Sequence, residues 1–141
     1  MAYSGRFIPE NPKKYRGDPT NIWYRSLWER RVMVYLDKNI HILEWSSEEI
    51  VIPYLSPVDN RYHRYFPDFY ARTKTETMII EVKPHAQSQM PKSSKRLTKG
   101  KLNEIMTYGV NQAKWQAANE YCKDRNWKFR VLTEKEIFGD K

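Results

Sequence analysis

The pattern of hydrophobic and polar positions changes several times along the chain and divides it into elements. Residues 1–24 show no sustained periodicity and mix proline and glycine with basic and aromatic side chains. Such a segment is typical of an extended arm rather than of a helix or strand. We expect this arm to pack against the rest of the protein through Phe7, Ile8 and Tyr15, or to stay mobile.

After Ser26 the spacing of apolar side chains becomes helical, and one stripe contains Trp28, Val32, Tyr35 and Leu36. Ser26 and Glu29 have the spacing of an N-terminal capping box, in which each side chain satisfies a free backbone N–H group. We therefore predict a helix that begins after Ser26 and ends near Asn39.

Three strand-like runs follow this helix. They cover residues 42–45 with a continuation at 50–55 after a turn at 46–47, residues 64–73, and residues 77–83. A polar turn at 73–76 joins the second run to the third. Pro53 lacks the N–H group that a central strand needs, so its segment is predicted to be an edge strand.

The second half of the chain predicts a loop, a helix and a strand. Residues 84–101 are rich in proline, serine, glutamine and lysine, which is typical of a long mobile loop. A helix is expected from Asn103 or Asn111 to Arg125, with one face made of Val110, Ala117, Ala118 and Tyr121. A strand at 128–133 and a helical turn at 134–138 follow. This order predicts a single-domain α/β fold with a mixed central sheet flanked by helices.

The composition agrees with one compact domain. The chain has 141 residues, of which 40% are hydrophobic and 14% aromatic, too many for an intrinsically disordered protein. It has no apolar stretch long enough for a membrane span and no apolar signal segment near its start. Cys122 is the only cysteine, so a disulfide within the chain is excluded. We expect a protein that is neither secreted nor membrane-bound.

The charge of the chain changes this picture, because it points to a partner. With 25 lysine and arginine residues against 17 acidic ones, the net charge is +8, which favours nucleic acid. Residues 1–36 carry +4, residues 37–82 carry −3, residues 83–101 carry +6 and residues 102–141 carry +1. Basic blocks around an acidic middle suit a nucleic-acid enzyme, with cations for phosphates and carboxylates for a metal.

The acidic middle and the first residue of the basic block after it contain three side chains that can carry chemistry. Glu81 and Lys83 are two positions apart on a strand, so their side chains project from the same face. If the second and third runs pair as a hairpin about residue 75, Asp68 lies level with Glu81 and Val82. Two carboxylates beside an ammonium group suit Mg²⁺ bound to a substrate phosphate. Lys83 would orient water or stabilise developing negative charge.

Simpler alternatives exist for these assignments. Asp68 and Glu81 could be ordinary exposed strand residues, with Lys83 at the end of its strand. Glu29 borders the core-facing stripe of the first helix, so it can be a third acid at the metal site or only the acidic member of the capping box. These two roles of Glu29 do not exclude each other.

Taken together, the motifs resemble those of the PD-(D/E)XK nuclease superfamily. Ser26-x-x-Glu29, Pro67-Asp68 and Glu81-Val82-Lys83 fall in the order of its αβββαβ core, over residues 22–135. The chain most resembles the branch of TnsA-like endonucleases. Within that branch, the head completion nucleases of T4-like tailed bacteriophages are similar in the segments YRSLWE, PVDNRYHRYFPDFY, EVKP, YGVNQAKW and VLTEKEI.

The resemblance implies a restriction-endonuclease-like fold and a role for each motif residue. Asp68 and Glu81 would bind Mg²⁺, or Mn²⁺, because oxygen ligands accept both ions. Lys83 would be the catalytic lysine and Glu29 the supporting acid. Because the core motif positions all hold standard residues, the resemblance implies an active enzyme.

Basic residues near the motifs are expected to bind the DNA backbone. They are Arg64, Lys92, Lys95, Arg96, Lys99, Lys101 and Lys114. For those in the loop the alternative is a solvated segment, and for Lys114 it is a lysine that extends along an apolar helix face to reach solvent. Backbone contacts of this kind are independent of sequence and weaken with salt.

These observations lead to one functional hypothesis and two alternatives. Residues 1–24 would form a basic arm, and residues 25–141 a Mg²⁺-dependent deoxyribonuclease domain, most simply an endonuclease. The resemblance implies action on DNA during bacteriophage head completion after packaging, with capsid, portal or neck proteins as partners, in the host cytoplasm or the virion. The alternatives are a structural DNA-binding capsid-completion protein that does not need catalysis, and a recombination or transposition endonuclease like TnsA.

Overall fold

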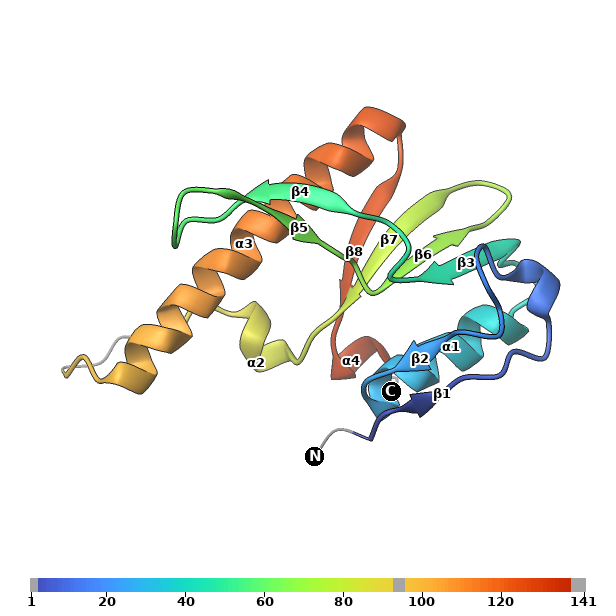
Figure 1. Cartoon of the computed structure of the whole chain (residues 1–141), viewed down its shortest axis with the longest axis horizontal. Coiled ribbons are helices and arrows are strands. Elements are labelled where there is room, and N and C mark those ends of the chain that lie inside the picture. Colours follow the sequence, from blue (N-terminus) through green and yellow to red (C-terminus); the bar gives the residue numbers. More distant parts are fainter. Residues whose placement is uncertain (1–2, 93–95, 138–141) are drawn as a thin grey trace.

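The computed structural model of the protein describes residues 3–92 and 96–137 (Figure 1). In chain order the elements are β1 (Gly5–Arg6), the 3-10 helix η1 (Pro12–Lys14), β2 (Trp23–Tyr24), α1 (Leu27–Lys38), β3 (Glu44–Ser47), β4 (Ile52–Leu55), β5 (Tyr62–Tyr65), β6 (Phe69–Arg72), β7 (Thr77–Val82), α2 (His85–Ser88), α3 (Lys99–Arg125), β8 (Lys128–Leu132) and α4 (Glu134–Ile137). No helix of the described part has the length and apolar character needed to cross a membrane.

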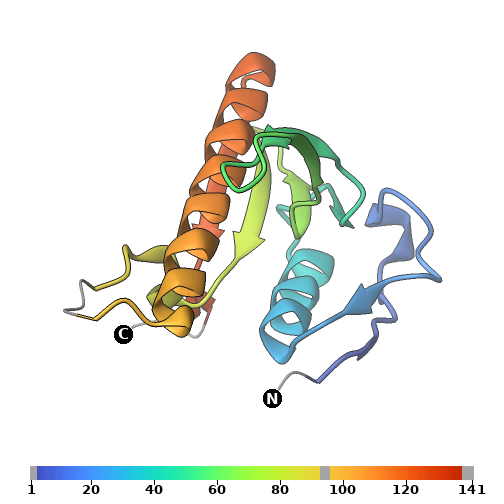
Figure 2. The same cartoon turned by 60° about the vertical axis from the view of Figure 1, so that its left-hand side comes forward.

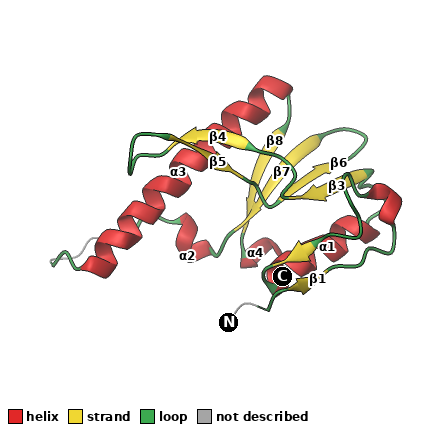
Figure 3. Cartoon of the chain, in the orientation of Figure 1, coloured by secondary structure: helices red, strands yellow, loops and turns green. Residues whose placement is uncertain are grey.

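A mixed four-stranded sheet forms the centre of the molecule, in the order β3-β6-β7-β8 (Figure 3). The β3–β6 and β6–β7 pairs are antiparallel, whereas β7 and β8 are parallel. Parallel neighbours need a crossover connection, and α3 forms most of it. The predicted single-domain α/β fold with a mixed sheet flanked by helices is therefore confirmed.

The two faces of this sheet are covered by different helices (Figure 2). Side chains alternate along β7, so Ile80 joins the core under α1 while Ile79 packs on the α3 side. The separate two-stranded sheet of β4 and β5 packs on α3, where Tyr65 contacts the cluster that contains Trp115. Pro53 lies in this small sheet, in agreement with its predicted edge position.

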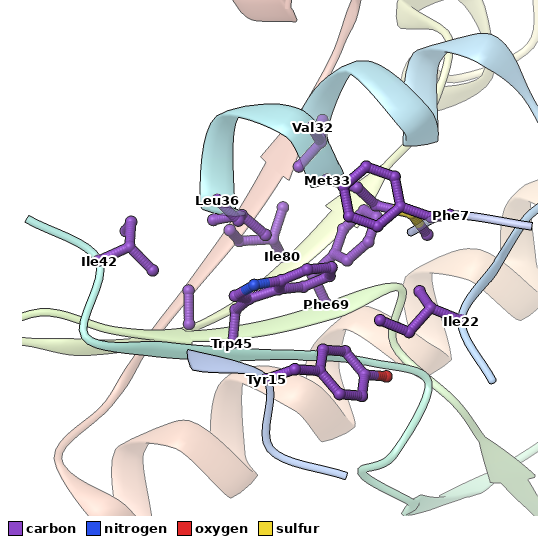
Figure 4. Packing of buried hydrophobic residues seen from close by; sticks show 11 residues of the cluster. Phe7, Tyr15, Ile22, Val32, Met33, Leu36, Ile42, Trp45, Phe69 and Ile80 are labelled. Carbon is purple, nitrogen blue, oxygen red and sulfur yellow. The ribbon is translucent and has the colours of Figure 1, made fainter. Parts of the chain in front are cut away.

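Trp45 of β3 lies at the centre of the larger core and is fully buried (Figure 4). Tyr15 and Phe7 both meet its ring edge-on, at centroid distances of 4.8 and 5.8 Å. The expectation that the first 24 residues pack through Phe7 and Tyr15 is confirmed, and Ile22 is buried with them. Ile8 is 81% exposed, so its prediction as a packing residue was wrong. Its neighbour Phe7 takes the inward side of this extended segment.

The predicted strand at 64–73 is two strands in two different sheets. β5 ends at Tyr65 and β6 begins at Phe69, and the buried Pro67 between them cannot donate a backbone hydrogen bond. The expected turn at 46–47 was also wrong, because both serines belong to β3. The chain turns instead at Glu48, whose φ of 55° lies in the left-handed region.

Helix α1 has the predicted bounds, with Ser26 at its N-cap and Asn39 at its C-cap. Tyr35 is 58% exposed, so its place on the buried stripe was wrong. Met33 is buried in its place.

Helix α3 begins at Lys99, before the predicted start at Asn103 or Asn111. The prediction missed its first turns because they are largely exposed and have no apolar stripe. The short helix α2 lies within the predicted loop. The expected helical turn at 134–138 is observed as α4 up to Ile137, and Phe138 lies outside the described residues.

Asp37 ties the amino-terminal segment to α1. This carboxylate is 1% exposed and accepts hydrogen bonds from the backbone N–H groups of Glu10 at 2.8 Å and Asn11 at 3.1 Å. Lys14 Nζ donates to the backbone carbonyls of Asp37 and Asn39, both at 2.8 Å, and so satisfies the end of the helix. One buried acid therefore fixes the segment that delivers Phe7 and Tyr15 to the core.

The substitution Asp37→Ala is expected to lower the free energy of unfolding by about 2–3 kcal/mol, because it removes the charged, buried acceptor of two backbone N–H groups. Urea unfolding measures this change. The exposed Asp124 at the end of α3 provides the matched control, since Asp124→Ala should change stability by less than about 0.5 kcal/mol. Equal effects of the two substitutions would contradict the anchoring role of Asp37.

Candidate active site

The β6–β7 pairing brings the predicted motif residues together. Phe69 pairs with Ile80, so Asp68 lies beside the next residues of β7. The backbone N–H group of Val82 donates to Asp68 Oδ2 at 2.7 Å. Lys83 Nζ lies 3.7 Å from Glu81 Oε2. The hairpin predicted about residue 75 therefore places the two carboxylates and the ammonium group at one end of the sheet.

Two further side chains surround the Glu81 carboxylate. The Tyr65 hydroxyl donates to Glu81 Oε1 at 2.7 Å from the end of β5. Lys114 of α3 places its Nζ 5.6 Å from the centre of the Tyr65 ring and 5.8 Å from that of Tyr54. The apolar helix face carries this lysine into the site instead of out to solvent, because the aromatic rings attract its charge.

A pocket of about 530 Å³ opens above these groups. Its walls come from the segment before α1, the turn after β3, the β5–β6 junction, the end of β7 and the middle of α3. The lining residues are Arg25, Glu48, Arg64, Tyr65, Phe66, Asp68, Glu81, Lys83 and Lys114. Three predicted basic residues, Arg64, Lys83 and Lys114, therefore share one pocket with both motif carboxylates.

The electrostatics of the pocket disfavour two negative charges. Burial, and next the neighbouring Glu81 carboxylate, raise the pKa of Asp68 to about 8. Burial also raises the pKa of Glu81, while the Tyr65 hydroxyl and then Lys83 act in the opposite direction. The pKa of Lys114 is lowered by burial and by the charge of Lys83. The hydrogen bonds and the positive charges around Asp68 and Glu81 therefore offset the cost of ionising these two carboxyl groups only in part.

Glu29 has the capping role and also lies close enough to influence the site. Its backbone N–H donates to Ser26 Oγ at 3.2 Å, and its Oε1 accepts from the backbone N–H of Arg25 at 3.3 Å. It does not line the pocket. Burial raises the pKa of Glu29, and the charges of Glu48 and Glu81 raise it further. The two roles expected for Glu29 are therefore compatible.

The donor set suits a hard divalent cation. Two buried carboxylates with raised pKa values would gain most from a cation between them, and Mg²⁺ often takes only one or two protein carboxylates with waters and substrate phosphate. Among residues 3–92 and 96–137 no three acidic, histidine or cysteine side chains form a cluster that could hold a metal unaided. Asp68 and Glu81 are the residues that fit the ion, and the remaining ligands would have to be water or phosphate oxygens.

The basic residues predicted to bind DNA fall into two groups. Arg64 and Lys114 line the pocket, and the Arg64 guanidinium lies 5.8 Å from the centre of the Phe66 ring. Lys92, Arg96, Lys99 and Lys101 lie outside it, at the amino-terminal end of α3 and in the preceding loop, which extend beyond the sheet in Figures 1 and 2. Lys101 is also paired with Glu104 at 3.8 Å. Lys95 lies outside the described residues.

Four pocket residues were missed by the sequence analysis: Arg25, Glu48, Tyr65 and Phe66. Tyr65 and Phe66 directly precede Pro67-Asp68, so proximity in sequence was a usable signal. Arg25 precedes the N-cap serine, which is again next to a recognised motif. Glu48 had no such signal, because only the left-handed turn after β3 brings it to the pocket.

Comparison with known proteins defines the class. Residues 39–134 match the family described as TnsA-like endonuclease, N terminal, and the chain belongs to this family of endonucleases. The matched region contains Asp68, Glu81, Lys83 and Lys114. The particular relative is equally clear: the chain is 44% identical over 139 residues to the head completion nuclease of Enterobacteria phage T4. That match covers 95% of this chain and 93% of the phage protein.

The raised pKa of Asp68 predicts a pH-dependent stability. A carboxyl group whose pKa is raised from 3.8 to about 8 by folding destabilises the folded state progressively as the pH rises through this range. Asp68→Asn keeps an acceptor for the Val82 N–H but removes the charge. In metal-free buffer it should therefore raise the free energy of unfolding by roughly 1–3 kcal/mol near pH 8, and by less near pH 5.

Chemical denaturation at several pH values measures this effect. Asp59→Asn is the control, because Asp59 is exposed and its hydrogen bond from His63 lowers its pKa, so this substitution should bring no such gain. An Asp68→Asn protein no more stable than the wild type at the higher pH would contradict the electrostatic description of the site.

Proposed function

We propose that this endonuclease-family protein is a Mg²⁺-dependent DNA nuclease that hydrolyses phosphodiester bonds in bacteriophage head completion. The observation that carries the proposal is the buried Asp68–Glu81 pair with Lys83 beside it, in a pocket rimmed by basic side chains. A structural DNA-binding protein has no need for two buried carboxylates that repel each other and repel phosphate, whereas a hydrolytic metal site requires them.

Asp68 and Glu81 would hold the cation, each fixed by a second group. The Val82 N–H orients Asp68, and the Tyr65 hydroxyl orients Glu81. When bound, a divalent ion in such a site acidifies a water molecule and neutralises charge on the phosphate. Mg²⁺ is the expected ion because the donors are hard oxygens, and Mn²⁺ should substitute.

Lys83 and Lys114 would act on the phosphate itself. Glu81 holds the Lys83 ammonium at the edge of the carboxylate pair, where it can donate to a phosphoryl oxygen as negative charge develops there. Lys114 brings a second positive charge from α3, held in place by the two tyrosine rings. Arg64 at the pocket mouth would bind a neighbouring phosphate. Glu29 would support the site through its negative charge and by fixing the backbone before α1.

Plasmid cleavage tests these roles. Wild-type protein should nick or linearise supercoiled DNA with Mg²⁺ or Mn²⁺, and EDTA should abolish the reaction. Asp68→Asn and Glu81→Gln should lower the rate at least about a thousandfold, and Lys83→Ala at least about a hundredfold. The exposed Lys74 in the β6–β7 turn is the matched control for Lys83, and Lys74→Ala should leave the rate unchanged. A wild-type protein that cleaves no form of DNA would contradict the proposal.

The name of the phage T4 relative supports the role in head completion. From that role we propose that the protein acts in the host cytoplasm during assembly and has capsid, portal or neck proteins as partners. Complementation of a phage that lacks this gene with the Glu81→Gln protein distinguishes a nuclease whose catalysis is required from a structural DNA-binding protein that does not need catalysis. Glu81→Gln keeps an acceptor for the Tyr65 hydroxyl, so the protein should fold. Failure to yield infectious particles would support required catalysis, and full rescue would support the structural role.

The basic segment before and at the start of α3 is proposed to extend the DNA contact beyond the pocket. Lys92, Arg96 and Lys99 are exposed and lie in a stretch with no acidic residue. Replacing all three with alanine should lower the slope of log affinity against log salt by up to about 2.7, which corresponds to three lost phosphate contacts. Fluorescence anisotropy with a labelled duplex measures the slope, and an unchanged slope would show that this segment is only solvated.

A further inference from the structure

Arg25 and Glu48 form an ion pair at the rim of the pocket, and the mechanism above does not use it. Arg25 Nη2 lies 3.0 Å from Glu48 Oε1, and both residues line the pocket. The two side chains come from different parts of the fold, since Arg25 precedes α1 while Glu48 follows β3. The pair therefore connects the amino-terminal side of the pocket to the sheet.

The backbone of Arg25 is fixed on both sides. β2 ends at Tyr24, and the N-cap residue of α1 is Ser26. The N–H group of Arg25 itself donates to Glu29 Oε1 at 3.3 Å. Its side chain is nevertheless 73% exposed and therefore accessible to an anion from solvent. A fixed backbone with an exposed guanidinium is a favourable arrangement for binding an anion.

Glu48 is held in an unusual backbone conformation. Its φ of 55° is costly for a residue other than glycine, and such conformations persist where the surrounding structure imposes them. Its N–H group donates to the backbone carbonyl of Asp68 at 3.1 Å, so the turn is tied to a residue that would hold the metal. The strained turn directs the Glu48 carboxylate to Arg25 and to the pocket.

A purely structural role explains this pair poorly. An ion pair with one partner so exposed contributes little to stability. Besides Glu48, however, the pocket contains Asp68 and Glu81, whose carboxylates attract any mobile cation. Glu48 would keep the Arg25 guanidinium at the rim, away from the carboxylates that the metal needs, and facing the entering DNA. Arginine also matches phosphate geometry through two parallel hydrogen bonds, which lysine cannot form.

We propose that Arg25 binds a backbone phosphate of the DNA next to the bond that is cut, and that Glu48 is the positioning residue that holds Arg25 at the pocket rim. The inference rests on the proposed nuclease function and adds a substrate contact to it. Arg25 and Arg64 line the same pocket from different elements, the segment before α1 and β5, so each would bind its own backbone phosphate.

DNA binding without metal tests Arg25 independently of cleavage. The affinity of a short fluorescein-labelled duplex is measured in EDTA at a series of KCl concentrations. Arg25→Ala should lower the slope of log affinity against log salt by about 0.9, the value for one lost phosphate contact. Arg25→Lys should keep the slope and bind a few-fold more weakly. Lys123→Ala, an equal charge change in the last turn of α3, should leave the slope unchanged. An unaltered slope for Arg25→Ala would overturn the inference.

A double-mutant cycle on the cleavage rate tests Glu48. Glu48→Gln should lower the single-turnover rate about tenfold in the wild-type background and less than about twofold in the Arg25→Ala background, because Glu48 acts through Arg25. Equal losses in both backgrounds would overturn its positioning role and indicate direct action at the metal. If the wild type cleaves no DNA, the proposed function fails, while the salt series still decides whether Arg25 contacts phosphate.

Discussion

The register between β6 and β7 is the constraint on which the active site depends. Because side chains alternate along a strand, Ile80 faces the core under α1 and Glu81 faces the side of α3. A shift of one residue would turn Glu81 into the apolar core under α1 and Ile80 toward the α3 side that contains the polar pocket, so the hydrophobic core itself enforces the register. The hydrogen bond from the Val82 N–H to Asp68 then fixes the second carboxylate against the first. The arrangement of the two carboxylates is therefore a consequence of packing.

The rest of the molecule supports a site that is unfavourable in the absence of a cation. Burial raises the pKa of both motif carboxylates, which means that ionising them opposes folding. The aromatic cluster around Trp45 and the packing of α3 on both sheets provide the compensating stability. In the proposed function, the same burial would exclude water that weakens the interaction of these carboxylates with a metal and of Lys83 with phosphate. Burial therefore both makes the ionised carboxylates unfavourable and, in the proposed function, strengthens their binding of a cation.

Local patterns and motif spacing predicted much of this structure. The bounds of α1, the β6–β7 hairpin and the mixed sheet followed from periodicity, and the hairpin alone was enough to bring Asp68 level with Glu81. What escaped prediction depends on long-range placement. The break at Pro67 sends one run of residues into two sheets, the exposed start of α3 carries no apolar stripe, and Glu48 reaches the pocket only through a left-handed turn. The break has a local signature in Pro67 itself, whereas the other two features have none in neighbouring residues.

The order in which the sheet can assemble follows from the length of its connections. A turn of only a few residues joins β6 to β7, whereas the helices α2 and α3 separate β7 from its parallel neighbour β8. Loop-closure entropy therefore favours the hairpin first and the docking of β8 last. The two carboxylates meet while water still solvates them, and their charges become costly only when α3 closes over the sheet. Nascent chains released before β8 is synthesised would thus contain the paired acids without the enclosed pocket around them.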